Sequence, residues 1–324
     1  MNFPKTAKTL DDQIALLKSR GLYIKDEKKA KHHLSNISYY RLSAYFLSFQ
    51  RYNDPHYAYM PRVTFEEIMS LYRFDRELRV IALDAIERIE VSLRCRIVYE
   101  FCTRYGNNWY EDKSFYSRGH AELMKKIRGE LSRTKETFIQ HYYGKYTNPQ
   151  NPPAWMAIEV LSFGQLSIMF KNLLANDAKK AVADHFGVGI AVLESCIENL
   201  AYIRNLCAHH SRLWNRTLTV RPTIPKRPKF DWINLPPTRV DKIYISLCIM
   251  AYLLQRADPT SYFTGKLKTL VCRLPKIDIK AAGFNEKWLS DPFWKNQYAS
   301  WTYWFRIMIF RSRTFVMYLL SLIK

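Results

Sequence analysis

One helical pattern runs without interruption over residues 64–106, TFEEIMSLYRFDRELRVIALDAIERIEVSLRCRIVYEFCTRYG. Thr64 and Glu67 form a capping box, in which the side chain of each residue accepts a hydrogen bond from the backbone N–H of the other. This pattern predicts that the helix begins here. An apolar stripe then recurs every three or four residues to about Arg104, just before Gly106. Its members are Ile68, Leu71, Leu78, Ile81, Ala85, Ile89 and Leu93. Such long stretches of helical period, in a chain with only 10 glycines, predict an all-α fold.

The polar side of this helix carries Glu87, Glu90 and Arg94. Glu90 and Arg94 are four residues apart and therefore predict an ion pair along the helix. The three residues could border a site, but a solvated helix face is the simpler interpretation.

Shorter helical patterns lie on both sides of the long one. Thr9 to Asp12 is a capping-box-like start for a helix that ends at Gly21, and Asp26 opens a second helix through Lys31. A third pattern covers residues 37–51, with Tyr40, Ala44 and Leu47 at the spacing of core residues. Downstream, after the breaker segment 148–153, the patterns predict helices at residues 154–174, 178–186, 190–209 and 239–256.

The helices divide into three parts by position and composition. We expect an N-terminal helical segment at residues 1–60, a helical core at residues 61–256, and a C-terminal extension at residues 257–324. The chain is long enough to bury one large core or two modest ones.

Charge is the strongest global property of the chain. The formal net charge is +21 and the isoelectric point is about 9.7, which favours a polyanionic partner, most often nucleic acid. Aromatic residues make up 15% of the chain and offer surfaces for stacking with unpaired bases, although most of them are expected in the core.

Motifs for cofactors and metals are absent from the sequence. It contains no Cys-x2-Cys pair, no His-Glu-x-x-His run and no glycine-rich phosphate loop, so we expect no cofactor and no metal. The N-terminus lacks an apolar signal region, and we therefore expect a cytoplasmic protein with reduced thiols.

Side chains suited to proton transfer and phosphate binding cluster where the helix at residues 190–209 ends, in the sequence RNLCAHH at residues 204–210. His209 can move a proton to or from a ribose 2′-hydroxyl, and the guanidinium of Arg204 can stabilise charge on a phosphate. Asn205 lies one turn before His209 on the same helix face. These groups could cleave RNA without a metal, but cations at a helix C-terminus also simply suit the helix dipole.

The spacing Arg-x4-His is weak by itself. Arg51 and His56 match it too, but Pro55 breaks any helix there, so we interpret that match as chance. Arg204 and His209 lie about 140° apart around an ideal helix. They can converge only if the helix ends or distorts near His209, or if a second copy of the chain completes the site.

Four separated blocks resemble the Abi family, the AbiD/AbiF-like abortive-infection proteins of bacteria. They are SYYRLSAY (38–45), TFEEIMSLYRFDRELR with AIERIEVSLR (64–94), PPAWMAIEVLSFGQLS (152–167) and NLCAHHSRLWNR (205–216). The resemblance covers roughly residues 5–290 and implies a helical bundle of the HEPN type, a homodimer, and RNA as the target in phage defence. Carried over by position, the catalytic residues are Arg204 and His209, with Asn205 beside them.

We therefore expect a metal-independent endoribonuclease toxin that uses Arg204, Asn205 and His209. His210, Arg212 and Arg216 follow directly and are expected to bind flanking phosphates of the RNA. An antitoxin or a regulatory RNA is a possible further partner.

Two alternatives stay open. The first is a non-catalytic RNA-binding protein. The second is an effector that acts on a membrane through residues 301–323, although Arg306, Arg311 and Arg313 make a spanning helix costly and a membrane partner the weaker expectation.

Overall fold

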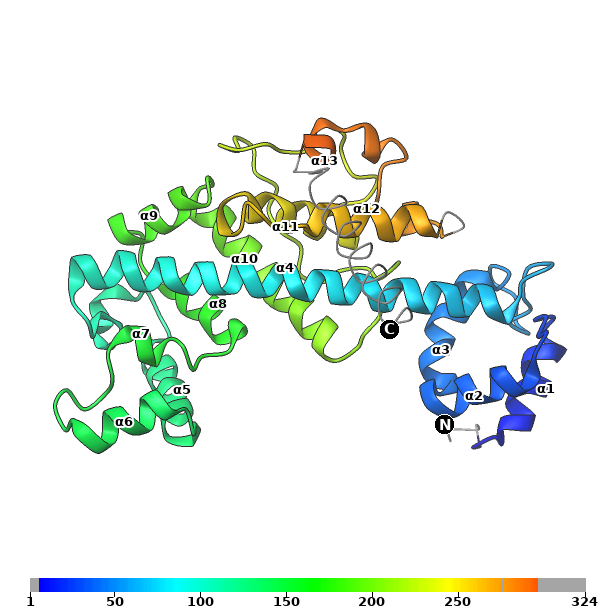
Figure 1. Cartoon of the computed structure of the whole chain (residues 1–324), viewed down its shortest axis with the longest axis horizontal. Coiled ribbons are helices and arrows are strands. Elements are labelled where there is room, and N and C mark those ends of the chain that lie inside the picture. The colour runs from blue at the N-terminus through cyan, green and yellow to red at the C-terminus, as the bar shows by residue number, and fades with distance from the viewer. Residues whose placement is uncertain (1–5, 275–276, 297–324) are drawn as a thin grey trace, which may run out of the picture.

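The computed structural model describes residues 6–274 and 277–296 (Figure 1). These residues form an all-α protein, as predicted, with no strand among them and only isolated β-bridges. The helices are α1 Leu10–Ser19, α2 Glu27–Ile37, α3 Tyr39–Phe46, α4 Phe65–Tyr105, α5 His120–Arg133, α6 Thr137–Lys145, α7 Ala154–Ala157, α8 Phe163–Asn172, α9 Asp177–His185, α10 Ile190–Ala208, α11 Ile243–Ala257, α12 Phe263–Arg273 and α13 Pro292–Asn296.

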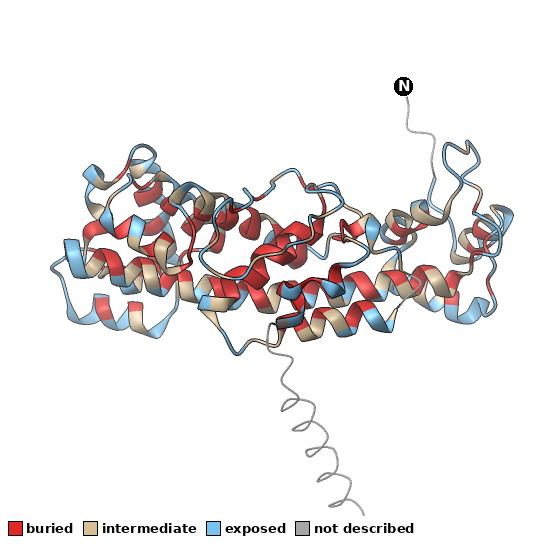
Figure 2. Cartoon of the chain, turned by 90° about the horizontal axis from the view of Figure 1, so that it is seen from above, coloured by how far each residue is buried: buried red, intermediate tan, exposed pale blue. Residues whose placement is uncertain are grey.

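Helix α4 is the axis of the molecule. Its 41 residues rise about 60 Å, and its start at Thr64 with the Glu67 capping box is as predicted. Helices α9, α10, α11 and α12 pack along it. Figure 1 places α1 to α3 at one end of α4 and α5 to α7 at the other, and Figure 2 shows the same division from above with the buried residues between the layers.

Helix α3 differs from the prediction in length and in the face that it buries. It ends at Phe46 and continues only as a short 3-10 turn, Leu47–Phe49. Tyr40 and Leu47, predicted to face the core, are 89% and 61% exposed. Leu42, Tyr45 and Phe46 face inward instead. Apolar residues occur on every side of this helix, so periodicity alone could not select the buried one.

Two other predictions need correction. The segment predicted as one helix at 154–174 is two helices, because Ser162 caps a new helix through a capping box with Gln165. The predicted Glu90–Arg94 ion pair is present at 2.5 Å. Arg94 is nevertheless buried, and its guanidinium also donates to the backbone carbonyls of Ile158 and Leu161. It ties α4 to the α7 region and does not lie on a solvated face.

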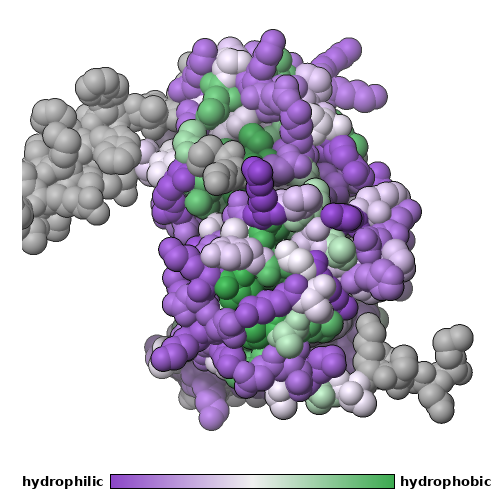
Figure 3. All heavy atoms as spheres, turned by 90° about the vertical axis from the view of Figure 1, so that its right-hand side faces the viewer, coloured by the Kyte–Doolittle hydropathy of each residue, from purple (hydrophilic) through white to green (hydrophobic). Residues whose placement is uncertain are grey.

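The end of the molecule that carries α1 to α3 exposes apolar side chains. Figure 3 looks onto this end and shows apolar residues gathered in its middle, with hydrophilic residues around them. Leu47 and Met60 are the exposed aliphatic or sulfur-containing side chains of this region, at 61% and 43%.

In the described ranges, no single helix combines the length and hydropathy needed to cross a membrane. Helices α9 and α10 meet that criterion only as a pair, across a 65° bend. The tail at residues 301–323, to which the membrane alternative refers, lies outside the described residues.

Candidate functional site

Helix α10 ends inside the Arg-x4-His motif. Its last residue is Ala208, and His209 is the C-cap. The N–H of Ser211 donates to the carbonyl of Leu206 at 2.8 Å and that of His210 donates to Cys207 at 3.0 Å, which is the Schellman arrangement. His210 occupies the left-handed position of this motif with φ of 55°, where glycine is usual. The chain therefore turns sharply directly after His209.

The side chains of Arg204, Asn205 and His209 all lie on the protein surface. Leu206 and Cys207, between them, are buried, and burial raises the pKa of the Cys207 thiol to about 12. None of the three exposed side chains forms a hydrogen bond or ion pair with another described residue. In one chain, the structure thus brings Asn205 and His209 to one face of α10 but does not join Arg204 to His209.

The turn after His209 is held by arginines from distant parts of the chain. The Arg41 guanidinium on α3 donates to the carbonyl of His210 at 2.8 Å. Arg79 on α4 donates to the carbonyl of Ser211 at 3.3 Å. In the opposite direction, the guanidinium of Arg212 donates to the carbonyl of Ala44 on α3. The turn that follows His209 is therefore connected to both α3 and α4.

Asp75 of α4 is the centre of this anchorage and is fully buried. Its carboxylate accepts the backbone N–H of Trp214 at 2.6 Å and that of Leu213 at 3.1 Å. It also accepts the hydroxyl of Tyr45 at 2.7 Å and a guanidinium N–H of Arg79 at 2.5 Å. Burial raises the pKa of the Asp75 carboxyl, and Arg79 and the hydrogen bonds counteract that effect. One carboxylate thus joins α3, α4 and the chain beyond the motif.

The next residues are anchored from the other side. Lys242, which is buried, donates through Nζ to the backbone carbonyl and side-chain oxygen of Asn215, at 3.1 and 3.0 Å. The indole N–H of Trp214 donates to the carbonyl of Asp278, and the N–H of Leu218 donates to that of Asp241, both at 2.8 Å. Residues 210–218, which directly follow His209, are therefore anchored by hydrogen bonds at both ends.

The residues predicted to bind flanking phosphates lie in different surroundings. His210 is exposed beside His209. Arg212 is half-buried against α3, and burial lowers the pKa of its guanidinium. Arg216 lies against Tyr202. Burial raises the pKa of the Tyr202 phenol, but hydrogen bonds with Thr219 and Arg216 lower it by more, so that the pKa is lowered overall. Tyr202 is seven residues before His209, which is two turns or about 10 Å along the same face of the helix. Arg216, which contacts Tyr202, is therefore about two turns from His209. Phosphate binding by these residues stays a prediction.

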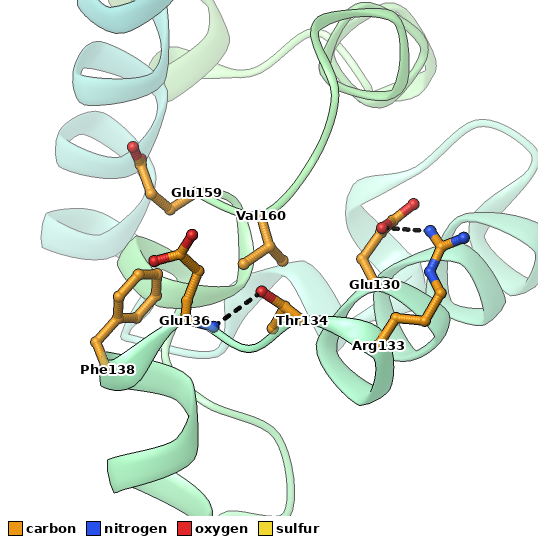
Figure 4. Close-up of a pocket in the computed structure, with 7 residues that line it drawn as sticks. All are labelled: Glu130, Arg133, Thr134, Glu136, Phe138, Glu159 and Val160. Carbon is orange, nitrogen blue, oxygen red and sulfur yellow. Dashed lines mark hydrogen bonds and ion pairs between the residues drawn. The ribbon is translucent and has the colours of Figure 1, made fainter.

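An open pocket lies elsewhere, between α5, α6 and the turn after α7. Its lining is Glu130, Arg133, Thr134, Glu136, Phe138, Glu159 and Val160 (Figure 4). Arg133 is already paired with Glu130 at 2.5 Å. The remaining carboxylates would repel phosphate groups. These helices are at the end of α4 away from α3, whereas the motif contacts α3 (Figure 1). We therefore assign the pocket no part in the site.

The described residues offer no second candidate site made of metal ligands or reactive thiols. Among these residues, no group of three or more His, Cys, Asp or Glu side chains is arranged to hold a metal ion. All of the cysteines are free.

The sequence analysis missed the buried supports of the motif. Arg41 and Tyr45 belong to the SYYRLSAY block, and Asp75 and Arg79 belong to the FDRELR segment. An aspartate and an arginine four residues apart within an apolar stripe were the available signal, because charged residues on the inner face of a helix are rarely buried unless they are paired.

One of three comparisons with known proteins gives a match. A family model described as "Abi-like protein" matches residues 32–215, which include Arg41, Asp75 and the whole motif. Neither the search of curated proteins nor the search of solved structures finds a match.

Proposed function

The chain belongs to the Abi-like protein family, and from that membership we propose that it is an endoribonuclease toxin of bacterial phage defence by abortive infection. The observation that carries the proposal is the set of exposed side chains at Arg204, Asn205 and His209, unengaged by other described residues and mounted on an immobilised turn. A catalytic group must be held within a fraction of an ångström of its working position, and buried supports such as Asp75 supply that rigidity.

The proposed reaction needs only side chains and the RNA. His209 takes the proton of a ribose 2′-hydroxyl as the 2′ oxygen attacks the adjacent phosphorus. The bond between phosphorus and the 5′ oxygen breaks, and that oxygen takes a proton from solvent water to become the 5′-hydroxyl. The guanidinium of Arg204 stabilises the charge that builds on the phosphate. The products are a 2′,3′-cyclic phosphate and a 5′-hydroxyl end.

The test of this function is the chemistry of the RNA ends. Purified protein should cut a single-stranded oligoribonucleotide and leave 2′,3′-cyclic phosphate ends, and the DNA oligomer of the same sequence should stay intact. Replacing the one 2′-hydroxyl at the cut position by hydrogen should block cleavage there. Products with 3′-hydroxyl ends would overturn the proposal, and binding without any cleavage would favour the non-catalytic RNA-binding alternative.

We predict that cleavage survives chelation by EDTA, because the proposed steps use an imidazole and a guanidinium and no Lewis acid. An unstructured oligoribonucleotide is the substrate of choice, since its conformation does not depend on magnesium. Loss of activity in EDTA that a divalent ion restores would contradict this mechanism.

We also propose that the active species is a homodimer in which the two motifs face each other. Arg204 and His209 are about 140° apart on an ideal helix, and no bond joins them within one described chain. A two-fold interface, the commonest kind in soluble oligomers, could bring Arg204 of one chain to His209 of the other. Repulsion between chains of charge +21 opposes association, and bound RNA or salt would reduce it.

Mixing an Arg204→Ala chain with a His209→Ala chain should therefore restore activity. Random pairing gives half mixed dimers, each with one intact shared site, so about a quarter of the wild-type rate is expected. In the control, the Arg204→Ala chain is mixed with the double variant Arg204→Ala/His209→Ala in place of the His209→Ala chain. This mixture should regain no cleavage activity. No rescue in verified mixed dimers, or full activity of a monomer, would rule out a shared site.

A further inference from the structure

Helix α3 and the 3-10 turn that follows it expose two large apolar side chains. Tyr40 on α3 is 89% exposed and Leu47 in the turn is 61% exposed, while Ala44 between them is partly buried against the core. The opposite side of the helix is buried through Leu42 and Phe46. Within the described part of the chain, the ring of Tyr40 makes no contact with another aromatic ring and its hydroxyl has no hydrogen-bond partner.

The helix that carries Tyr40 is hydrogen-bonded to the chain around the proposed catalytic turn. Arg41, the residue after Tyr40, donates to the carbonyl of His210 at 2.8 Å. Ala44, four residues after Tyr40 on α3, accepts a hydrogen bond from Arg212 through its carbonyl. The helix that carries Tyr40 is thus bonded at two points to the chain that directly follows His209.

Exposed tyrosines are common on protein surfaces and by themselves indicate nothing. Tyr40 differs in its setting, because the next residue, Arg41, donates to the carbonyl of His210, and the turn held in this way follows the exposed side chains of Arg204 and His209. An exposed aromatic ring on the helix that is bonded to a turn with an exposed, unengaged guanidinium suits unpaired nucleotides, whose bases stack on such a ring while a cation neutralises the backbone.

We infer that Tyr40 is a stacking platform for an unpaired base adjacent to the cleaved bond, so that the substrate is single-stranded RNA. This inference rests on the proposed function and adds the substrate class and the residue that selects it. Paired bases are stacked within their own helix and cannot reach the ring, which disfavours a duplex.

The experiment measures binding separately from cleavage. The full-length His209→Ala chain is titrated into a 5′-labelled single-stranded oligoribonucleotide and, in parallel, into a blunt RNA duplex of the same sequence, with fluorescence anisotropy as the readout. Adding Tyr40→Ala should weaken single-strand binding roughly tenfold, which corresponds to about 1.4 kcal/mol and lies within the range for one stacked base. Tyr40→Phe should bind like the parent, and Tyr40→Leu should bind weakly, because it keeps apolar area but no flat ring.

Tyr99→Ala is the matched control. This tyrosine is 55% exposed and lies about 36 Å from Asp75 along α4, so its loss should leave binding unchanged. Equal affinity of the Tyr40→Ala chain and its parent would overturn the stacking role while leaving cleavage by His209 intact. A change in oligomeric state with unaltered RNA affinity would identify a second copy of the chain as the occupant and also overturn it. If the parent binds neither probe, the proposed function fails together with the inference.

Discussion

Alanine at His209 or at Arg204 is expected to lower RNA cleavage by at least about 100-fold, the usual contribution of a positioned proton-transfer group or of a donor that stabilises transition-state charge. Both side chains are exposed and form no bond to other described residues, so the free energy of unfolding should stay within about 0.5 kcal/mol of the wild type. The measurement is the single-turnover rate on one oligoribonucleotide, together with a urea unfolding curve for each variant.

His210 provides the matched control for this experiment. It is the neighbouring exposed histidine, but it occupies a left-handed backbone position that glycine adopts without strain. His210→Gly should therefore fold normally and should lose far less activity than His209→Ala. If His210→Gly were inactive and His209→Ala active, the catalytic histidine would have been assigned one residue too early.

Replacing Asp75 by alanine is expected to destabilise the protein by about 3–5 kcal/mol, the usual effect of removing one partner of a buried ion pair. Arg79 would keep its buried charge without a carboxylate, and the N–H groups of Leu213 and Trp214 would lose their acceptor. Cleavage should fall as well, because the turn that carries His209 loses its main anchor. The urea unfolding curve measures the loss of stability. The cleavage rate at urea concentrations below the unfolding transition measures the loss of activity separately.

A graded series keeps this prediction testable if the Asp75→Ala chain does not fold. Tyr45→Phe removes one hydrogen bond to the same carboxylate and should cost about 1.5–3 kcal/mol. Asp84→Ala is the control on the same helix. Its carboxylate pairs with Arg88 and Lys266 in partial contact with solvent, so about 1 kcal/mol or less is expected. A larger effect at Asp84 than at Tyr45 would contradict the central role of Asp75.

Local patterns in the sequence determined the helices that position the site. The capping box of Thr64 and Glu67 starts α4, and the stripe from Ile68 to Leu93 makes it continuous, because capping and 3.6-residue periodicity act within one or two turns. The end of α10 near His209 was predicted for the same reason. The family was recognisable because its blocks are contiguous stretches of sequence.

The tertiary structure alone decided which faces are buried and what supports the motif. In α3, apolar and aromatic residues surround the helix, so only packing against α4 could show that Tyr45 faces inward and Tyr40 outward. Asp75 and Trp214 are 139 positions apart, and no local rule relates them. The exposure of His209 likewise depends on what the rest of the chain leaves uncovered. Local energetics act between near neighbours in sequence, whereas the contacts that hold the turn after His209 join residues that only the completed fold brings together.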